Sequence, residues 1–228
     1  MINTKQILDD FNGVVPIFPL PDFVMYPKTA YNFNIFESRY KDLVSDVLSS
    51  NRLFCTSLLK PSSDIQNVDS LDFYSIGNLC YIAEYDKLDN GNYNIMVSGL
   101  KKIKIKNELD SDKNYRIVDV DIYNDNDFVD REQEKRKKIV NKFTSLFSFQ
   151  DEAMDLKSID TSMIPIEMLT NLGSLILPLE SIDKQKLLEL DSIELRLEVL
   201  CQFMDSELKV ESDLNRFNNI IPTNINWN

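Results

Sequence analysis

The pattern of apolar and polar residues predicts two halves of different structure. Up to about residue 123, apolar residues form short runs or alternate with polar ones, which is typical of β-strands. From about residue 127 they recur at helical spacing. Strands followed by helices, rather than alternating with them, favour an α+β fold. We therefore expect a mostly antiparallel, barrel-like or sandwich-like β part with a helical part behind it.

At least six strands are expected in the first half. Asn90 and Gly91 separate two of them and form the dipeptide that most strongly predicts a hairpin turn. The run at 14–20 contains two prolines, so we expect it to be an edge strand or to begin with a bulge. The expected strands cover residues 14–20, 52–59, 76–86, 93–97, 101–107 and 116–123.

Lysines alternate with isoleucines in the run at 101–107, which predicts a strand with one buried and one solvated face. A row of lysines also protects an exposed sheet edge from pairing with other chains. This structural interpretation outweighs one in which the same lysines bind nucleic acid. The residues concerned are Lys101, Lys102, Lys104 and Lys106.

One helix is expected within the β half and four after it. The first carries an apolar stripe over residues 40–48. The later ones are expected at 131–147, at 163–177 with Pro178 ending it, after a candidate cap at Ser181, and from Ser192 onward. The predicted organisation is an N-terminal extension (1–13), a β part (14–124), a helical part (125–211) and a loosely ordered tail (212–228).

Composition excludes several classes of function. The chain has 228 residues and a net charge of −12, which repels a phosphate backbone. It contains no histidine, so a Ser/His/Asp triad, a Cys/His dyad and a His-based zinc site are excluded. Ser/Lys and paired-carboxylate hydrolysis remain chemically allowed, but no spaced motif supports either. No signal peptide or membrane span is recognisable, so we place the chain in the cytoplasm.

No cofactor or metal is expected. The sequence has no glycine-rich phosphate loop. The acidic run at 124–130 resembles the beginning of a calcium loop in composition but lacks the glycine at its sixth position, so a solvated linker is the preferred interpretation. The three cysteines are far apart in apolar surroundings, which predicts reduced core thiols. They are Cys55, Cys80 and Cys201.

Glu37 and Arg39 stand at the beginning of the first helix, beside Phe36 and Tyr40. A carboxylate at a helix start interacts favourably with the backbone amides and the helix dipole. If it is buried, it must also be paired or hydrogen-bonded. A structural ion pair is favoured over a catalytic acid.

An ordered series of segments resembles the N-terminal, substrate-recognition domain of Lon proteases. The form Ile-Phe-Glu-x-Arg-Tyr most resembles short bacterial proteins that consist of that domain alone. The resemblance covers roughly residues 14–208 and departs from the family where Lys28 replaces a usual glycine or other small residue. The ATPase and Ser/Lys protease domains of a full Lon are not present in this sequence. The segments are 16–27, 34–40, 76–79, 88–91, 97–102, 177–180, 184–189 and 196–197.

The resemblance implies a PUA-like pseudo-barrel followed by a helical bundle, without enzyme activity. It also implies that a structural signature fastens the first helix to the barrel as a buried lock. The signature residues are Phe36, Glu37, Arg39 and Tyr40.

The function implied is non-catalytic binding of unfolded or apolar protein segments, or of a dedicated protein partner. The candidate binding residues are Met25, Tyr26 and Pro27 in one loop, and Tyr85 and Leu88 at the hairpin. The structural alternative is that these side chains pack on the barrel. A functional alternative is RNA binding through the PUA-like barrel, using the lysine row and the basic run at 136–138.

Overall fold

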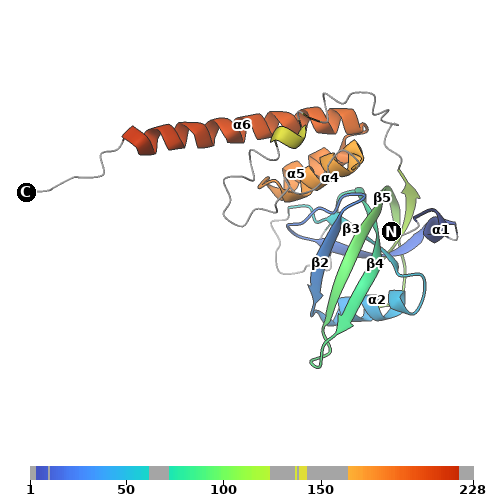
Figure 1. Cartoon of the computed structure of the whole chain (residues 1–228). Coiled ribbons are helices and arrows are strands. Elements are labelled where there is room, and N and C mark those ends of the chain that lie inside the picture. Colours follow the sequence, from blue (N-terminus) through green and yellow to red (C-terminus); the bar gives the residue numbers. More distant parts are fainter. Residues whose placement is uncertain are drawn as a thin grey trace, which may run out of the picture.

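The computed structural model describes residues 4–9, 11–61, 72–123, 137, 139–142 and 164–220, with side chains described for residues 6–206 of these ranges. Helices α4, α5 and α6 lie together beyond one end of the strands, and α2 lies at the opposite end (Figure 1). The strands are β1 Val14–Leu20, β2 Ala30–Ile35, β3 Leu53–Leu58, β4 Ile76–Lys87, β5 Tyr93–Leu109 and β6 Ile117–Ile122. The helices are α1 Thr4–Leu8, α2 Ser38–Leu48, α4 Ile166–Ile176, α5 Ser181–Glu189 and α6 Ile193–Ile220.

The six strands form one sheet that closes on itself. Their order is β2-β5-β4-β3-β1-β6, and β5 also pairs with β6. The long strand β5 makes this possible, because its first part pairs with β2 and β4 and its last part pairs with β6. Only the β1–β3 pair is parallel among these pairings. The predicted α+β fold with mostly antiparallel strands is confirmed, and the β part is a barrel rather than a sandwich.

β1 is an internal strand, so the prediction of an edge strand at 14–20 is wrong. Its first residues pair with β6 and its last four with β3. The Ile17 N–H donates to the Arg116 carbonyl on the β6 side, at 3.0 Å. Successive backbone nitrogens point to opposite sides of a strand. The nitrogen of Pro16 therefore faces the β3 side, where pairing with β3 has not yet begun, and the nitrogen of Pro19 faces the β6 side, where pairing with β6 has ended. The prolines therefore cost the sheet no hydrogen bond.

The lysine row does not lie on a sheet edge either. β5 lies inside the sheet, and Lys102 is only 2% exposed. Its ammonium group donates to the Leu190 carbonyl at 2.8 Å and lies 4.7 Å from the centre of the Tyr123 ring. Lys106 pairs with two aspartates of β6, Asp119 and Asp121. The alternation correctly predicted a strand, but the face assigned to solvent is partly covered by the helical part.

Two apolar clusters hold the molecule together. One fills the barrel and includes the stripe predicted for α2, since Tyr40, Leu43, Val44 and Val47 are all buried in it. The other lies between the barrel and helices α4, α5 and α6. From the β part, this second cluster includes Val24, Tyr26 and Leu58 and, at its margin, Phe23, Tyr74 and Ile76.

Local signals place most element ends correctly. The Asn90–Gly91 hairpin is confirmed, and Gly91 has the positive φ of 78° that such a turn requires. α4 begins directly after Pro165 and ends before Pro178. The Ser192 hydroxyl accepts a hydrogen bond from the Leu195 N–H at the beginning of α6. Ser181 is instead the first residue of α5, and Glu180 occupies the cap position.

The C-terminal helix is longer than the sequence suggests. α6 continues to Ile220 and extends past α4 and α5 (Figure 1), so residues 212–220 of the predicted tail are helical. Residues 221–228 lie outside the described residues. Of the helix predicted at 131–147, residues 137 and 139–142 are described and helical, and the acidic run at 124–130 is outside the described ranges.

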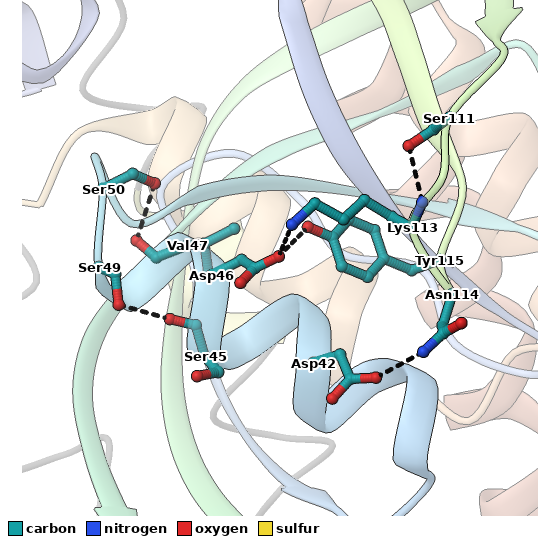
Figure 2. Close-up of polar contacts among 10 residues, drawn as sticks. All are labelled: Asp42, Ser45, Asp46, Val47, Ser49, Ser50, Ser111, Lys113, Asn114 and Tyr115. Atoms are coloured by element: carbon teal, nitrogen blue, oxygen red, sulfur yellow. Dashed lines mark hydrogen bonds and ion pairs between the residues drawn. The ribbon is translucent and has the colours of Figure 1, made fainter.

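Polar contacts attach α2 to the segment between β5 and β6 (Figure 2). The Asp46 carboxylate accepts hydrogen bonds from the Lys113 ammonium at 2.7 Å and from the Tyr115 hydroxyl at 2.6 Å. One turn earlier, the Asn114 amide donates to Asp42 at 3.0 Å. These bonds hold the pKa of Asp46 below its usual value, because they favour its charged form.

Replacing Asp46 with asparagine is expected to lower the free energy of unfolding by about 1 kcal/mol at pH 7, since these charge-assisted bonds are largely exposed to solvent. The pKa of Asp46 is lower in the folded state than in the unfolded state. Its contribution is therefore complete above pH 4, roughly the unfolded pKa, and is lost as pH falls through the folded pKa. Urea unfolding of both proteins between pH 7 and pH 2 measures this.

Asp42→Asn is the matched control for this prediction. It alters a single hydrogen bond to Asn114 on the same helix, so a smaller loss is expected. Equal stability of the wild type and Asp46→Asn at pH 7 would contradict the role assigned to these contacts.

Candidate functional site

The loop at 25–27 is buried, so these three residues do not form the exposed binding surface that the sequence analysis assigns to them. Tyr26 is 0% exposed, and its hydroxyl donates to the Lys184 carbonyl of α5 at 2.5 Å. Burial raises the pKa of Tyr26. The Pro27 carbonyl accepts a hydrogen bond from Asn171 of α4 at 2.9 Å, and Met25 packs in the barrel core. The loop joins the barrel to the helices, as the structural alternative anticipates.

Lys28, where the family pattern usually has a glycine or another small residue, adopts a backbone conformation typical of glycine. Its φ of 60° lies in the left-handed region that favours glycine. The Lys28 N–H donates to the Gly99 carbonyl at 2.8 Å, and the Thr29 hydroxyl donates to the Tyr26 carbonyl at 2.7 Å. The Lys28 side chain forms an ion pair with Glu167 of α4. The turn is therefore one that glycine also adopts readily, and the lysine side chain forms a contact between barrel and helices.

The other two binding candidates lie on the hairpin between β4 and β5. The Tyr85 side chain is 50% exposed, and the Arg52 guanidinium lies 5.8 Å from its ring centre. Leu88 is half-buried. Tyr85 is thus accessible, and the hairpin remains a candidate contact surface.

The predicted signature at the start of α2 does not form a buried lock. Arg39 donates to the Glu37 carboxylate at 3.0 Å, but the carboxylate is exposed and both residues belong to the same turn. Phe36 is 64% exposed. Only Tyr40 contacts the barrel core, with its ring centre 4.4 Å from that of Phe18, and burial raises its pKa. Tyr40 and the contacts in Figure 2 fasten α2, while the ion pair stays at the surface.

Three aromatic side chains form a surface cluster that we call the aromatic shelf: Phe23, Tyr31 and Phe33. Their ring centres lie 4.3 Å apart for Phe23–Tyr31, 5.3 Å for Phe23–Phe33 and 5.0 Å for Tyr31–Phe33. Tyr31 is 44% exposed, and the other two are half-buried. Tyr31 and Phe33 share one face of β2 because they are two residues apart. Phe23 reaches them from the loop between β1 and β2.

This shelf was not predicted from the sequence. Tyr31 and Phe33 alternate with Asn32 and Asn34, a pattern typical of a strand with one apolar face. This alternation predicts the apolar face of the strand from the sequence alone. It does not reveal whether another element covers the apolar face, and nothing in the sequence brings Phe23 beside it.

The opposite face of the same strands carries a groove of about 520 Å³, whose lining includes the exposed carboxylates Glu84 and Asp86. Its lining comes from β2, β5 and β4, whose residues pair across the sheet as Asn32↔Met96↔Glu84 and Asn34↔Asn94↔Asp86. The Asn34 amide donates to the Asn94 side chain at 2.7 Å. β2 thus separates an aromatic surface from a polar surface that carries two carboxylates.

Possible metal ligands and cysteine thiols are the reactive groups of the described residues. These residues contain no group of three His, Cys, Asp or Glu side chains that is placed to hold a metal ion. Cys55 and Cys80 are buried free thiols, as predicted, and burial raises both pKa values, that of Cys80 to about 12. Cys201 is half-buried on α6. Within the same ranges, no helix is both long and apolar enough to cross a membrane.

Comparison with known proteins decides the family. Residues 14–206 match the family described as the ATP-dependent protease La (LON) substrate-binding domain. This chain belongs to that family. The Lon domain named in the match is a non-catalytic one, and the expectation drawn from the ordered sequence segments is confirmed.

The relatives and structural neighbours agree with the Lon assignment. The chain is 25% identical to a Lon protease of Buchnera aphidicola subsp. Acyrthosiphon pisum over 85% of its length, and 33% identical to one of Desulfosudis oleivorans over 46%. It spans a quarter or less of these relatives. Its fold is similar to the N-terminal domain of Mycobacterium avium complex Lon protease and to a Lon N-terminal domain protein from Xanthomonas campestris. The TM-scores are 0.64 and 0.62, the identities 15% and 18%, and both alignments cover 84% of this chain and 98% of the other.

Proposed function

We propose that this chain is a non-catalytic module that binds unfolded or apolar segments of other proteins, and that the aromatic shelf is part of its binding surface. Membership of the Lon substrate-binding family supports a protein as the partner. The observation that carries the site is the contact of three aromatic rings at the surface, with Tyr31 nearly half exposed. Such clusters on a soluble domain are typical of binding sites for apolar segments.

The chemistry of the shelf suits a partner without fixed structure. Aromatic rings supply a large contact area and lose little conformational entropy, so they bind many apolar side chains without demanding one shape. Phe33 also contacts Phe18 in the barrel, at 5.8 Å between ring centres, which anchors the shelf to a rigid body. The shelf is therefore preorganised for binding, and a segment that docks there does not pay for ordering it.

RNA binding, the alternative function, has a weak physical basis in the described residues. Of the lysines considered for it, Lys102 is buried and Lys106 is paired with two aspartates. Lys101 and Lys104 are three residues apart on β5 and so belong to opposite faces of the strand, and the chain has a net charge of −12. Of the basic run at 136–138, only Lys137 is among the described residues. Neither the family match nor the structural neighbours support this alternative.

Tyr31→Ser is expected to weaken binding of a labelled, permanently unfolded polypeptide about tenfold. An exposed aromatic side chain at an interface commonly contributes roughly 1–2 kcal/mol to the binding free energy. Fluorescence anisotropy measures the affinity. Tyr85→Ser is the matched control, since it removes a tyrosine of similar exposure from the hairpin. Unchanged binding by Tyr31→Ser together with weakened binding by Tyr85→Ser would move the site to the hairpin.

A further inference from the structure

The edge of β2 is open for pairing. Among the described strands, β2 pairs with β5 alone, in continuous register from Ala30↔Ser98 to Ile35↔Tyr93. In a strand with one partner, every second N–H and C=O group points away from the sheet. Residues 30, 31, 32 and 34 are exposed, which agrees with an accessible edge.

β2 also lacks the features that normally protect an edge strand. Proteins block such edges with charged residues, prolines, bulges or very short strands. The sequence of β2, AYNFNI, contains no charge and no proline, and its register with β5 has no shift. Six residues are a full-length strand by ordinary standards. An unprotected edge strand on a highly charged chain indicates that pairing with another chain at this edge is functional.

We infer that a bound polypeptide segment joins the sheet as an additional strand alongside β2, with alternate side chains on the aromatic shelf. This inference rests on the proposed function and specifies how the same surface binds. Main-chain hydrogen bonds would provide affinity for any sequence, and the shelf would select apolar side chains at every second position. The combination explains how one site accepts many unfolded segments.

The two faces of β2 define the chemistry of the segment. On one face, Tyr31 and Phe33 contact large apolar or aromatic side chains of the added strand. The other face of β2 carries Asn32 and Asn34, both exposed, and the chain has a net charge of −12, so the intervening side chains are polar or basic rather than acidic. The occupant is an extended segment that alternates apolar with polar or basic residues.

Backbone methylation of a peptide tests strand addition. The probe is a labelled ten-residue peptide that alternates Phe or Leu with Thr or Lys, made unmodified, N-methylated at the odd residues, or N-methylated at the even residues. In a paired strand, only alternate N–H groups face the neighbour. One methylated peptide is therefore expected to bind at least tenfold more weakly than the unmodified peptide, while the other binds within about threefold of it.

Other outcomes separate this inference from the proposed function. Equal affinity of all three peptides, or equal weakening of both methylated ones, would overturn strand addition and leave binding through side chains intact. Failure of the unmodified peptide while the unfolded polypeptide still binds would overturn the alternating-segment inference alone. Failure of both would overturn the proposed function as well.

Amide hydrogen exchange of the protein provides an independent measurement. Binding of the unmodified peptide is expected to protect alternate amides between Ala30 and Ile35, those that do not bond to β5. The matched control peptide carries Glu in place of each Lys and is expected to bind more weakly, because this chain has a net charge of −12. Protection confined to the β4–β5 hairpin would overturn the inference.

Discussion

Replacing Arg196 with methionine is expected to lower the free energy of unfolding by about 3 kcal/mol or more. Arg196 is 0% exposed, and its guanidinium donates to the carbonyls of Leu187, Leu188 and Leu190 and to the Asn171 side chain, at 2.7–3.3 Å. Methionine fills part of the space but donates nothing. Buried carbonyl groups that lose their donors cost roughly 1–3 kcal/mol each, and relief of guanidinium desolvation offsets part of this.

The position of Arg196 explains why the loss is large. The three carbonyls lie at the C-terminal end of α5, where the helix dipole is negative and carbonyls lack helical partners. Lys102 of β5 donates to the same Leu190 carbonyl, so α6 and the barrel meet at this point. Arg196→Lys keeps the charge without the planar fork and is expected to recover only part of the stability. Urea unfolding followed by circular dichroism measures both variants, and a loss below 1 kcal/mol in Arg196→Met would contradict this role.

Gly99→Ala is expected to cost about 3 kcal/mol, through steric overlap rather than lost hydrogen bonds. A methyl group at this position would lie 2.1 Å from the Tyr26 carbonyl oxygen and 2.5 Å from the Asn78 amide nitrogen. The backbone cannot withdraw easily, because Gly99 donates to the Thr29 carbonyl and accepts from the Lys28 N–H. The expected result is displacement of the buried loop that joins the barrel to the helices.

Gly91→Ala separates this overlap from a general effect of replacing glycine. Nothing lies within 4 Å of an added methyl group at Gly91, and its positive φ alone makes alanine unfavourable, by roughly 1 kcal/mol. Thermal and urea unfolding of the two variants measure the difference. A Gly99→Ala protein no less stable than Gly91→Ala would show that the close approach at Gly99 is absent in solution.

Much of the fold was predictable because it depends on local signals. The Asn90–Gly91 turn, the apolar stripe of α2 and the limits of α4 at Pro165 and Pro178 all follow from the sequence nearby. These features need no knowledge of which segments meet in space. The ordered resemblance to the Lon domain supplied the connection between them, and the family match confirms it.

The remaining features depend on contacts between distant segments. The prolines of β1 indicate an edge only if the strand has the same neighbour along its whole length, whereas β1 changes partner after Pro16. The alternation in the sequence assigns Lys102 to a solvated face, whereas in the structure its ammonium group donates to the Leu190 carbonyl. Tyr26 is buried for the same reason, since α5 supplies the acceptor for its hydroxyl. Alternation identifies the two faces of a strand, but only tertiary structure decides which face is covered.

The candidate site shows this limit most clearly. Met25, Tyr26 and Pro27 belong to the segment that carries the family resemblance, yet they are buried where the barrel meets the helices. The accessible aromatics, Tyr31 and Phe33, lie in a strand whose sequence pattern is ordinary. The resemblance therefore marks residues that maintain the fold, and the surface proposed for binding emerges only from the packing of β2 and Phe23.

Preferential binding of unfolded polypeptide is tested by one titration. Fluorescence anisotropy of a labelled, permanently unfolded polypeptide is measured against increasing concentrations of this chain, beside its folded counterpart and a single-stranded RNA of equal length. We expect the unfolded polypeptide to bind at least tenfold more tightly than either of the others. Equal affinity for the folded counterpart, tighter binding of the RNA, or no binding of the unfolded polypeptide would contradict the claim.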